Sequence, residues 1–191
     1  MSFTQEYREK LIDTINGIDL AKVDQAIEWL KEARAADRHI FVCGNGGSAS
    51  TASHFACDIV KGASYQRDAR FRIMALTDNL PVLTAYSNDV GYDVVFVEQL
   101  KNFAGAGDVV IAISGSGNSP NVVRAVEYAN QMGCKTIALT GRDGGKLGPM
   151  AKLNIQVSVP HMGRIEDAHM IVCHMIGYHF MDTEYATSVR D

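Results

Sequence analysis

Two loops rich in serine and glycine carry the clearest chemical signal in this 191-residue sequence. The first spans residues 43–48 (CGNGGS) and the second spans residues 114–119 (SGSGNS), and each lies between an apolar run and a helical pattern. Glycine lets the backbone approach a ligand closely, and the first turn of a helix offers unpaired N–H groups. With serine hydroxyls as further donors, both loops are suited to holding a phosphate group.

Helix capping is the alternative explanation for these serines. Ser48 and Ser119 stand at plausible N-caps, and either one alone is explained as well by capping as by a ligand. Three serines that alternate with glycine in the second loop are harder to explain in this way. Neither loop matches a nucleotide-binding pattern, since GxxxxGK[ST] is absent and Ala49 occupies the last glycine position of GxGxxG. The loops therefore favour a small phosphate ester over ATP or NAD.

Histidine and carboxylate side chains occur at helical spacing in two segments. His54 and Asp58 are four residues apart and share one helix face, about two turns beyond the first loop. The last helical segment carries Glu166, His169 and His174. A surface ion pair explains the first segment, and a packed core histidine explains His174, if each is taken alone. Two such pairs beside a phosphate pocket instead favour a divalent cation such as Zn²⁺.

The spacing on the last helix limits how one ion can be bound. Positions 166 and 174 lie about 12 Å apart along a straight helix. One ion contacts both only if it lies between two long side chains, or if the two residues come from different subunits. His169, three residues after Glu166, is the nearer alternative partner.

The elements that position these residues follow an alternating pattern. Two amphipathic helices at 3–16 and 20–36 come first, and five strands are then expected at 39–43, 71–76, 108–113, 135–140 and 154–159. Helices are expected at 48–61, 79–87, 92–103, 119–132 and 164–183, with a short helical turn near 146–151. The apolar runs 109–113 and 136–139 are continuous, as in parallel strands buried on both faces.

This pattern predicts the α/β class. We expect a single doubly wound domain over 1–191, with a five-stranded parallel sheet flanked by helices in 38–191 and an N-terminal helical arm in 1–37. Both serine loops then lie at the carboxyl ends of strands, where open α/β sheets bind ligands.

Composition narrows the partners and the compartment. The formal net charge of −4 argues against nucleic acid as a ligand, because binding a phosphate backbone needs a basic face. No apolar run approaches membrane-spanning length, and the N-terminus lacks an apolar signal core. The four cysteines form no CxxC pair, which indicates a reducing compartment. We therefore expect a cytoplasmic protein with no membrane or nucleic-acid partner.

The sequence resembles a known family. The two loops and LTGRDGG at 139–145 resemble the sugar isomerase (SIS) domain and, more narrowly, the phosphoheptose isomerase family. The resemblance covers nearly the whole chain, including SNDVG at 87–91 and RIEDAH at 164–169. It implies the SIS fold and the isomerisation of sedoheptulose 7-phosphate to D-glycero-D-manno-heptopyranose 7-phosphate through a metal-assisted enediol mechanism. It also implies a homotetramer, in which the apolar stripes of the arm and the last helix pack between subunits.

The resemblance assigns roles residue by residue. It implies zinc binding by His54, Asp58, Glu166 and His174, with Asp58 as the base and His174 as the acid. The residues implied to contact the substrate are Asn45, Gly46, Gly47, Ser48, Asp58, Asn88, Asp89, Ser114, Gly115, Ser116, Ser119 and Glu166.

Three positions depart from the family pattern. Asp58 stands where the family usually has Glu, Glu166 where it usually has Gln, and Gly62 where it often has Arg. Asp is one methylene shorter than Glu, and a displacement of about 1 Å can cost about 10²-fold in rate. Two carboxylates and two neutral histidines would neutralise a divalent ion fully, which implies tighter metal binding or a different metal.

These departures keep two other functions open. The first is an SIS isomerase for another sugar phosphate, with Asp58 and Glu166 marking an altered substrate shape. The second is a non-catalytic SIS protein, like the family member that binds a replication initiator. A phosphosugar-sensing regulator is disfavoured, because the residues before the first strand are too few and too acidic for a DNA-binding helix-turn-helix.

Overall fold

The computed structural model describes residues 1–188, with side chains described as far as residue 183; the last three residues of the expected domain lie outside this range. Helices alternate with strands along the chain much as the sequence predicts. The strands are β1 (His39–Gly44), β2 (Arg72–Ala75), β3 (Val109–Ser114), β4 (Lys135–Gly141) and β5 (Leu153–Val157). The α-helices are α1 (Phe3–Asn16), α2 (Leu20–Ala35), α3 (Gly47–Cys57), α4 (Leu80–Asp89), α5 (Val97–Phe103), α6 (Pro120–Gln131), α7 (Leu147–Met150) and α8 (Met162–Ser188).

Two expected helices are divided in the structure. The helix expected at 48–61 is α-helical only as far as Cys57 and continues as the π-helical turn η1 (Asp58–Gly62), closed by a hydrogen bond from Ala63 N–H to Asp58 C=O. The helix expected at 92–103 begins as the 3₁₀ turn η2 (Tyr92–Val94) and resumes as α5. The π turn matters for function, because such turns are frequent at functional sites.

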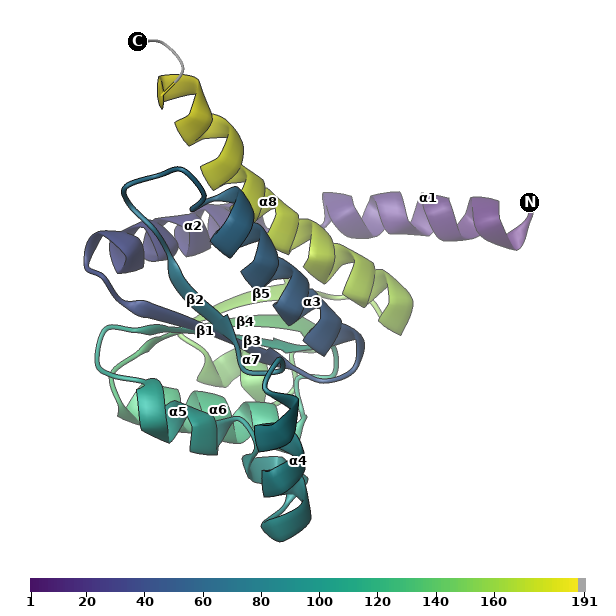
Figure 1. Cartoon of the computed structure of the whole chain (residues 1–191). Helices are drawn as coiled ribbons and strands as arrows, with labels where there is room; N and C mark the ends of the chain where they lie inside the picture. The colour runs from purple at the N-terminus through teal and green to yellow at the C-terminus, as the bar shows by residue number, and fades with distance from the viewer. Residues whose placement is uncertain (189–191) are drawn as a thin grey trace.

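The sheet has five parallel strands in the order β2-β1-β3-β4-β5 (Figure 1). Every residue of β3, the central strand, is buried. Side chains alternate between the two faces of a strand, and β1 shows the consequence. Ile40 and Val42 pack under α2, α3 and α8, whereas Phe41 and Cys43 pack against α5 and α6. The expected α/β fold with a parallel sheet between two helical layers is confirmed.

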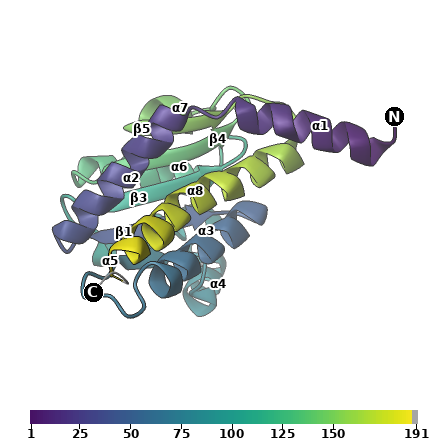
Figure 2. The same cartoon turned by 90° about the horizontal axis from the view of Figure 1, so that it is seen from above.

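The chain reverses its winding direction between β1 and β3. The helix after β1, α3, covers one face of the sheet, and the helix after β3, α6, covers the other (Figure 2). In doubly wound sheets this arrangement opens a crevice beyond the carboxyl ends of the two neighbouring strands. Both serine loops therefore border the position where such folds bind ligands.

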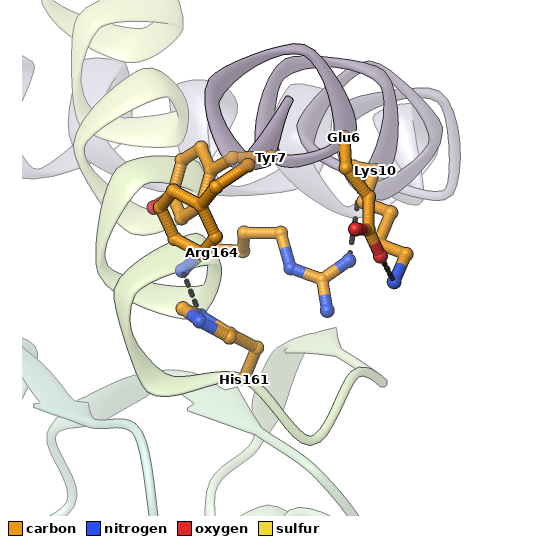
Figure 3. A pocket seen from close by; sticks show the side chains of 6 residues that line it. Glu6, Tyr7, Lys10, His161 and Arg164 are labelled. Carbon is orange, nitrogen blue, oxygen red and sulfur yellow. Dashed lines mark hydrogen bonds and ion pairs between the residues drawn. The ribbon is translucent and has the colours of Figure 1, made fainter. Parts of the chain in front are cut away.

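Helix α1 projects beyond the rest of the molecule and is attached to the beginning of α8 (Figures 1 and 2). The Tyr7 hydroxyl donates a hydrogen bond of 2.6 Å to Asp167 Oδ2, and this carboxylate raises the pKa of Tyr7. Arg164 extends beneath α1 toward the Lys10 carbonyl, with an Nη1–O distance of 3.4 Å (Figure 3). His161 packs edge-on against the Tyr7 ring, and a hollow of about 90 Å³ remains between these side chains.

In the described part of the chain, the helices are all too short or too polar to cross a membrane.

Candidate active site

The first serine loop is a tight connection between β1 and α3. Gly46 has φ +54° and ψ −121°, a backbone conformation that favours glycine. Gly44 is confined by its neighbours, because a Cβ atom there would lie 2.8 Å from Ser48 Cβ and 2.9 Å from the Ile113 carbonyl oxygen. The glycines thus let the loop turn directly from the strand end into the first turn of α3.

Capping does not account for the serines at the helix starts. The N-cap of α3 is Gly46, so Ser48 lies inside the helix, where it is buried. Ser119 is the N-cap of α6, but its side chain makes no capping hydrogen bond. Its hydroxyl lies 3.2 Å from that of Ser114, which in turn lies 3.5 Å from the Ser116 hydroxyl. Three hydroxyl groups are therefore gathered at the end of β3, an arrangement suited to a phosphate group.

A paired-amide contact joins the two loops. The side-chain amides of Asn45 and Asn121 exchange two hydrogen bonds of 2.9 Å, and the Tyr92 hydroxyl donates a third to Asn45 Oδ1. Neither Asn121 nor Tyr92 was expected at the site from the sequence. The position of Asn121 in the first turn of α6, beside the second serine loop, is the only signal that pointed to it.

The LTGRDGG segment and the two residues after it, Lys146 and Leu147, support the second serine loop. Leu147 N–H donates to the Gly117 carbonyl at 2.9 Å, and Lys146 N–H donates to Asn118 Oδ1 at 3.1 Å. The backbones approach so closely that a Cβ atom on Gly117, at φ +65°, would overlap the Gly144 carbonyl. The segment singled out in the sequence therefore fixes the shape of the loop.

Three of the four predicted metal ligands meet between α3 and α8. His54 Nε2 lies 3.2 Å from Asp58 Oδ2 and 3.1 Å from His174 Nε2, and His174 Nε2 lies 3.7 Å from Asp58 Oδ2. All three donor atoms fall within 4.8 Å of one another. Ligand atoms that each lie 2.0–2.1 Å from a tetrahedral zinc ion are separated by about 3.3 Å. The donor atoms and their spacing fit such an ion.

The buried oxygen of Asp58 supports the same conclusion. Asp58 Oδ2 is inaccessible to solvent and accepts no hydrogen bond from any residue that the structure describes. A buried acceptor without a partner is costly, so a ligand for this oxygen is expected. The residue also begins the π turn η1, which sets its backbone apart from the regular turns of α3.

Glu166, the fourth predicted ligand, lies apart from this group in the described structure. A Cβ atom on Gly47 would be 2.6 Å from Glu166 Oε1, so the carboxylate lies against the first residue of α3. A negative charge there interacts favourably with the helix dipole. It also lies where the first serine loop would receive a phosphate.

His169 does not join the group either. Its ring is buried, Nε2 lies 3.1 Å from the Thr140 carbonyl oxygen, and Nδ1 has no partner among the described residues. Burial lowers the pKa of His169 to about 4, so the ring is neutral at ordinary pH. Its surroundings are those of a core histidine that links α8 to β4.

The remaining predicted residues lie at the margins. Asn88 and Asp89 form the exposed last turn of α4, with a hydrogen bond of 2.7 Å between their side chains. Where the family often has Arg, Gly62 leaves space that the Met181 thioether fills. The substrate contacts of Asn88 and Asp89 stay predictions.

Comparisons with known proteins extend over most of the chain. The family model of the SIS domain matches residues 3–141. The probable phosphoheptose isomerase of Thermoplasma volcanium is 47% identical over 159 residues, which are 83% of this chain and 81% of the relative. The phosphoheptose isomerase of Aliarcobacter butzleri is 42% identical over 174 residues, 90% of this chain and 88% of the relative. The structure of phosphoheptose isomerase from Neisseria gonorrhoeae matches with a TM-score of 0.85 and 35% identity, covering 93% of this chain and 96% of that one.

Proposed function

The chain belongs to the SIS domain family and, within it, to the phosphoheptose isomerases, and from this premise we propose that it converts sedoheptulose 7-phosphate into D-glycero-D-manno-heptopyranose 7-phosphate. One observation supports the proposal most strongly. His54, Asp58 and His174 meet between α8 and α3, the helix that begins at the first serine loop. Acid–base groups and a phosphate-binding loop are what a sugar-phosphate isomerase needs.

The spacing along α3 suits a sugar phosphate. We place the phosphate between the loops, near Ser48, Ser114, Ser116 and Ser119. His54 follows Ser48 by six residues, which is about 9 Å along a helix. A sugar that reaches along α3 from its phosphate would bring its carbonyl end to the acid–base group. Asn88 and Asp89 would contact its hydroxyl groups.

The reaction requires two proton transfers at the carbonyl end. Asp58 removes a proton from C1, the C–H electron pair forms the C1–C2 double bond, and the C2 carbonyl oxygen takes up a proton to give an enediol. The proton on the C1 oxygen then leaves, the C1 carbonyl forms, and C2 is protonated. His174 moves the proton between the oxygens or delivers it to C2. Its imidazole is suited to this because one nitrogen donates while the other accepts.

A divalent cation, with zinc as the first candidate, is part of the proposal. His54, Asp58 and His174 would hold it, and Glu166 would complete the set if its side chain turned from Gly47. When bound, such an ion polarises the carbonyl and stabilises negative charge on the sugar oxygens.

The direct test supplies sedoheptulose 7-phosphate to the purified protein and measures the aldose product. Asp58→Asn and His174→Ala are expected to lower the rate by at least about 10²-fold, as for lost general acid–base groups. His161→Ala is the matched control, because His161 lies on the exposed connection before α8. Unchanged activity in either site variant would contradict the assigned roles, and an inactive wild type would contradict the proposed substrate.

The second candidate is isomerisation of a different sugar phosphate. The carboxylate of Glu166 beside Gly47 and the methionine that fills the space at Gly62 favour it, because both alter what the substrate contacts. Rates with ketose phosphates of five, six and seven carbons distinguish the two. A non-catalytic role, the remaining alternative, predicts no turnover of any of them.

We also propose a cytoplasmic homotetramer whose subunits pack through the arm of residues 1–37 and helix α8. Large apolar side chains on these helices are exposed in the single chain, among them Phe3 at 75%, Leu20 at 58% and Tyr178 at 50%. Burying such side chains is favourable and supports association. Light scattering coupled to size exclusion measures the assembly, and a monomer of 20.8 kDa would contradict it.

A further inference from the structure

Besides the hollow between α1 and α8, another hollow adjoins the second serine loop on the side of β4 and β5. It has a volume of about 540 Å³ and lies at the carboxyl ends of β3, β4 and β5. The residues that line it come from the three loops after these strands: Ser116, Asn118, Arg142, Asp143, Ser158, Val159 and Pro160. Its position follows the rule for ligand binding in open parallel sheets. Ser116 lines this hollow and also belongs to the hydroxyl cluster, so the hollow adjoins the proposed phosphate position.

The backbone at Arg142 is held in a conformation that arginine rarely adopts. Its φ is +55°, in the left-handed region that favours glycine. Two hydrogen bonds fix it, one of 3.0 Å from Arg142 N–H to the Val157 carbonyl and one of 2.8 Å from Gln156 Nε2 to the Arg142 carbonyl. A non-glycine residue persists there when its surroundings determine the backbone, and such positions gather at ligand sites.

The guanidinium group of Arg142 has no partner among the residues that the structure describes. No hydrogen bond or ion pair of this group occurs within the described residues, and the side chain is exposed at the hollow. The nearby Asp143 carboxylate is engaged in its own turn, where Oδ1 accepts the Gly145 N–H at 3.1 Å. Ser158 is likewise engaged, with its hydroxyl 3.0 Å from Gln156 Nε2. Arg142 is the cation that lines this hollow, and it is available to a ligand.

The side chains of the proposed substrate site carry no positive charge. None of the side chains predicted to contact the substrate is cationic, whereas Asp58, Asp89 and Glu166 are acidic. The Glu166 carboxylate lies against Gly47, at the start of the helix that faces the phosphate. A phosphate dianion in these surroundings is stabilised by a charged donor, and a guanidinium group matches phosphate with two parallel hydrogen bonds.

We propose that Arg142 binds the phosphate group of the substrate together with Ser116, an inference that rests on the phosphate-ester substrate proposed above. The left-handed backbone presents the side chain to the hollow, and the serine hydroxyls and helix N-termini complete the anion site. Arg142 is a phosphate-binding residue in this assignment and takes no part in the proton transfers.

The test variant is Arg142→Gly, because glycine adopts a positive φ without strain. The melting temperature is expected to stay equal or rise, while the affinity for inorganic phosphate, measured by titration calorimetry, falls about ten- to a hundredfold, the range for hydrogen bonds to charged groups. Lys146→Gln is the matched control, since it removes one positive charge from the same turn outside the hollow. It is expected to bind phosphate as the wild type does.

Wild-type phosphate affinity in Arg142→Gly, or a wild type that binds no phosphate, would overturn the assignment. An equal loss in Lys146→Gln would do so too, because the effect would then be that of net charge alone. With sedoheptulose 7-phosphate, the loss is expected in KM rather than in kcat and is partly restored in Arg142→Lys. Phosphate binding needs no turnover, so it tests Arg142 even if the proposed reaction fails.

Discussion

At the scale of single residues, Asp58 and Glu166 occupy different environments. Asp58 lies between two imidazoles, with a buried oxygen that accepts no hydrogen bond from the described residues. Glu166 lies at the start of α3. Its negative charge interacts favourably with the helix dipole there but would repel a phosphate group. The two carboxylates therefore lie in different parts of the candidate site. Asp58 lies with His54 and His174, whereas Glu166 lies beside the first serine loop.

Glu166→Gln is expected to strengthen phosphate binding. The substitution removes a negative charge beside Gly47 while keeping the size of the side chain. Inorganic phosphate should bind the metal-free protein about three- to tenfold more tightly, which is the gain expected from removing one partly screened like charge. Titration calorimetry at low salt measures it, with Glu9→Gln on the exposed side of α1 as the control for net charge. An affinity equal to that of the wild type would show that the carboxylate does not act on the phosphate.

At the scale of elements, the sequence predicted where the strands end. It did not predict how α3 and α8 pack against each other. Each serine loop follows an apolar run, so its place at the sheet edge could be inferred from the sequence alone. Positions 166 and 174 are far apart along one helix, so the sequence also predicted that their side chains would not readily contact one ion. The structure agrees: His174 lies beside His54 and Asp58, whereas Glu166 lies at the start of α3.

Other features of the site depend on packing between distant segments. The π turn at Asp58 has no specific sequence signal, because DIVKG is equally compatible with the last turn of an α-helix that ends at a glycine. The pairing of Asn45 with Asn121 joins residues 76 positions apart, and the hollow at Arg142 needs three loops from three strands. Sequence patterns report local periodicity, so contacts of this kind lie beyond them.

The attachment of α1 to α8 can be tested by removing a single hydroxyl group. Tyr7→Phe removes the hydroxyl that binds Asp167 and leaves the ring against His161. We expect faster amide hydrogen exchange in α1 and a loss of about 1.5–3 kcal/mol in its local stability, as for a hydrogen bond to a charged acceptor. Tyr65→Phe, at an exposed tyrosine, is the control. Equal exchange of α1 in both variants would show that other contacts hold the arm.

At the scale of the whole molecule, the candidate site combines residues from the two helical layers that cover opposite faces of the sheet. His54, Asp58 and His174 meet between α3 and α8 in one layer, whereas the second serine loop leads into α6 in the other. The parallel sheet holds the two in register through the pairing of β1 with β3, in which Gly44 lies beside Ile113. Changes to the packing of α8 on the sheet therefore affect both stability and the site. His169, which links α8 to β4, is the titratable group in that contact.

The stability of the folded chain is expected to fall in mild acid because of His169. Its pKa is about 4 in the folded protein, below the ordinary value of 6.5, so folding favours the neutral ring. The contribution to stability is complete above pH 6.5 and is lost as the pH falls toward 4, since the unfolded chain then binds the proton more readily. Between pH 7 and pH 4.5 the free energy of unfolding should fall by about 2–3 kcal/mol from this residue.

His169→Gln isolates this contribution, because the amide can still donate to the Thr140 carbonyl but does not titrate. Urea unfolding at pH 7 and pH 4.5 measures the difference in each protein. The variant is expected to be less stable than the wild type at pH 7, owing to the changed packing, and to lose about 2–3 kcal/mol less on acidification. His161→Gln, at an exposed histidine, should keep the wild-type pH dependence. If His169→Gln kept it too, the acid sensitivity of the fold would have to arise from other groups.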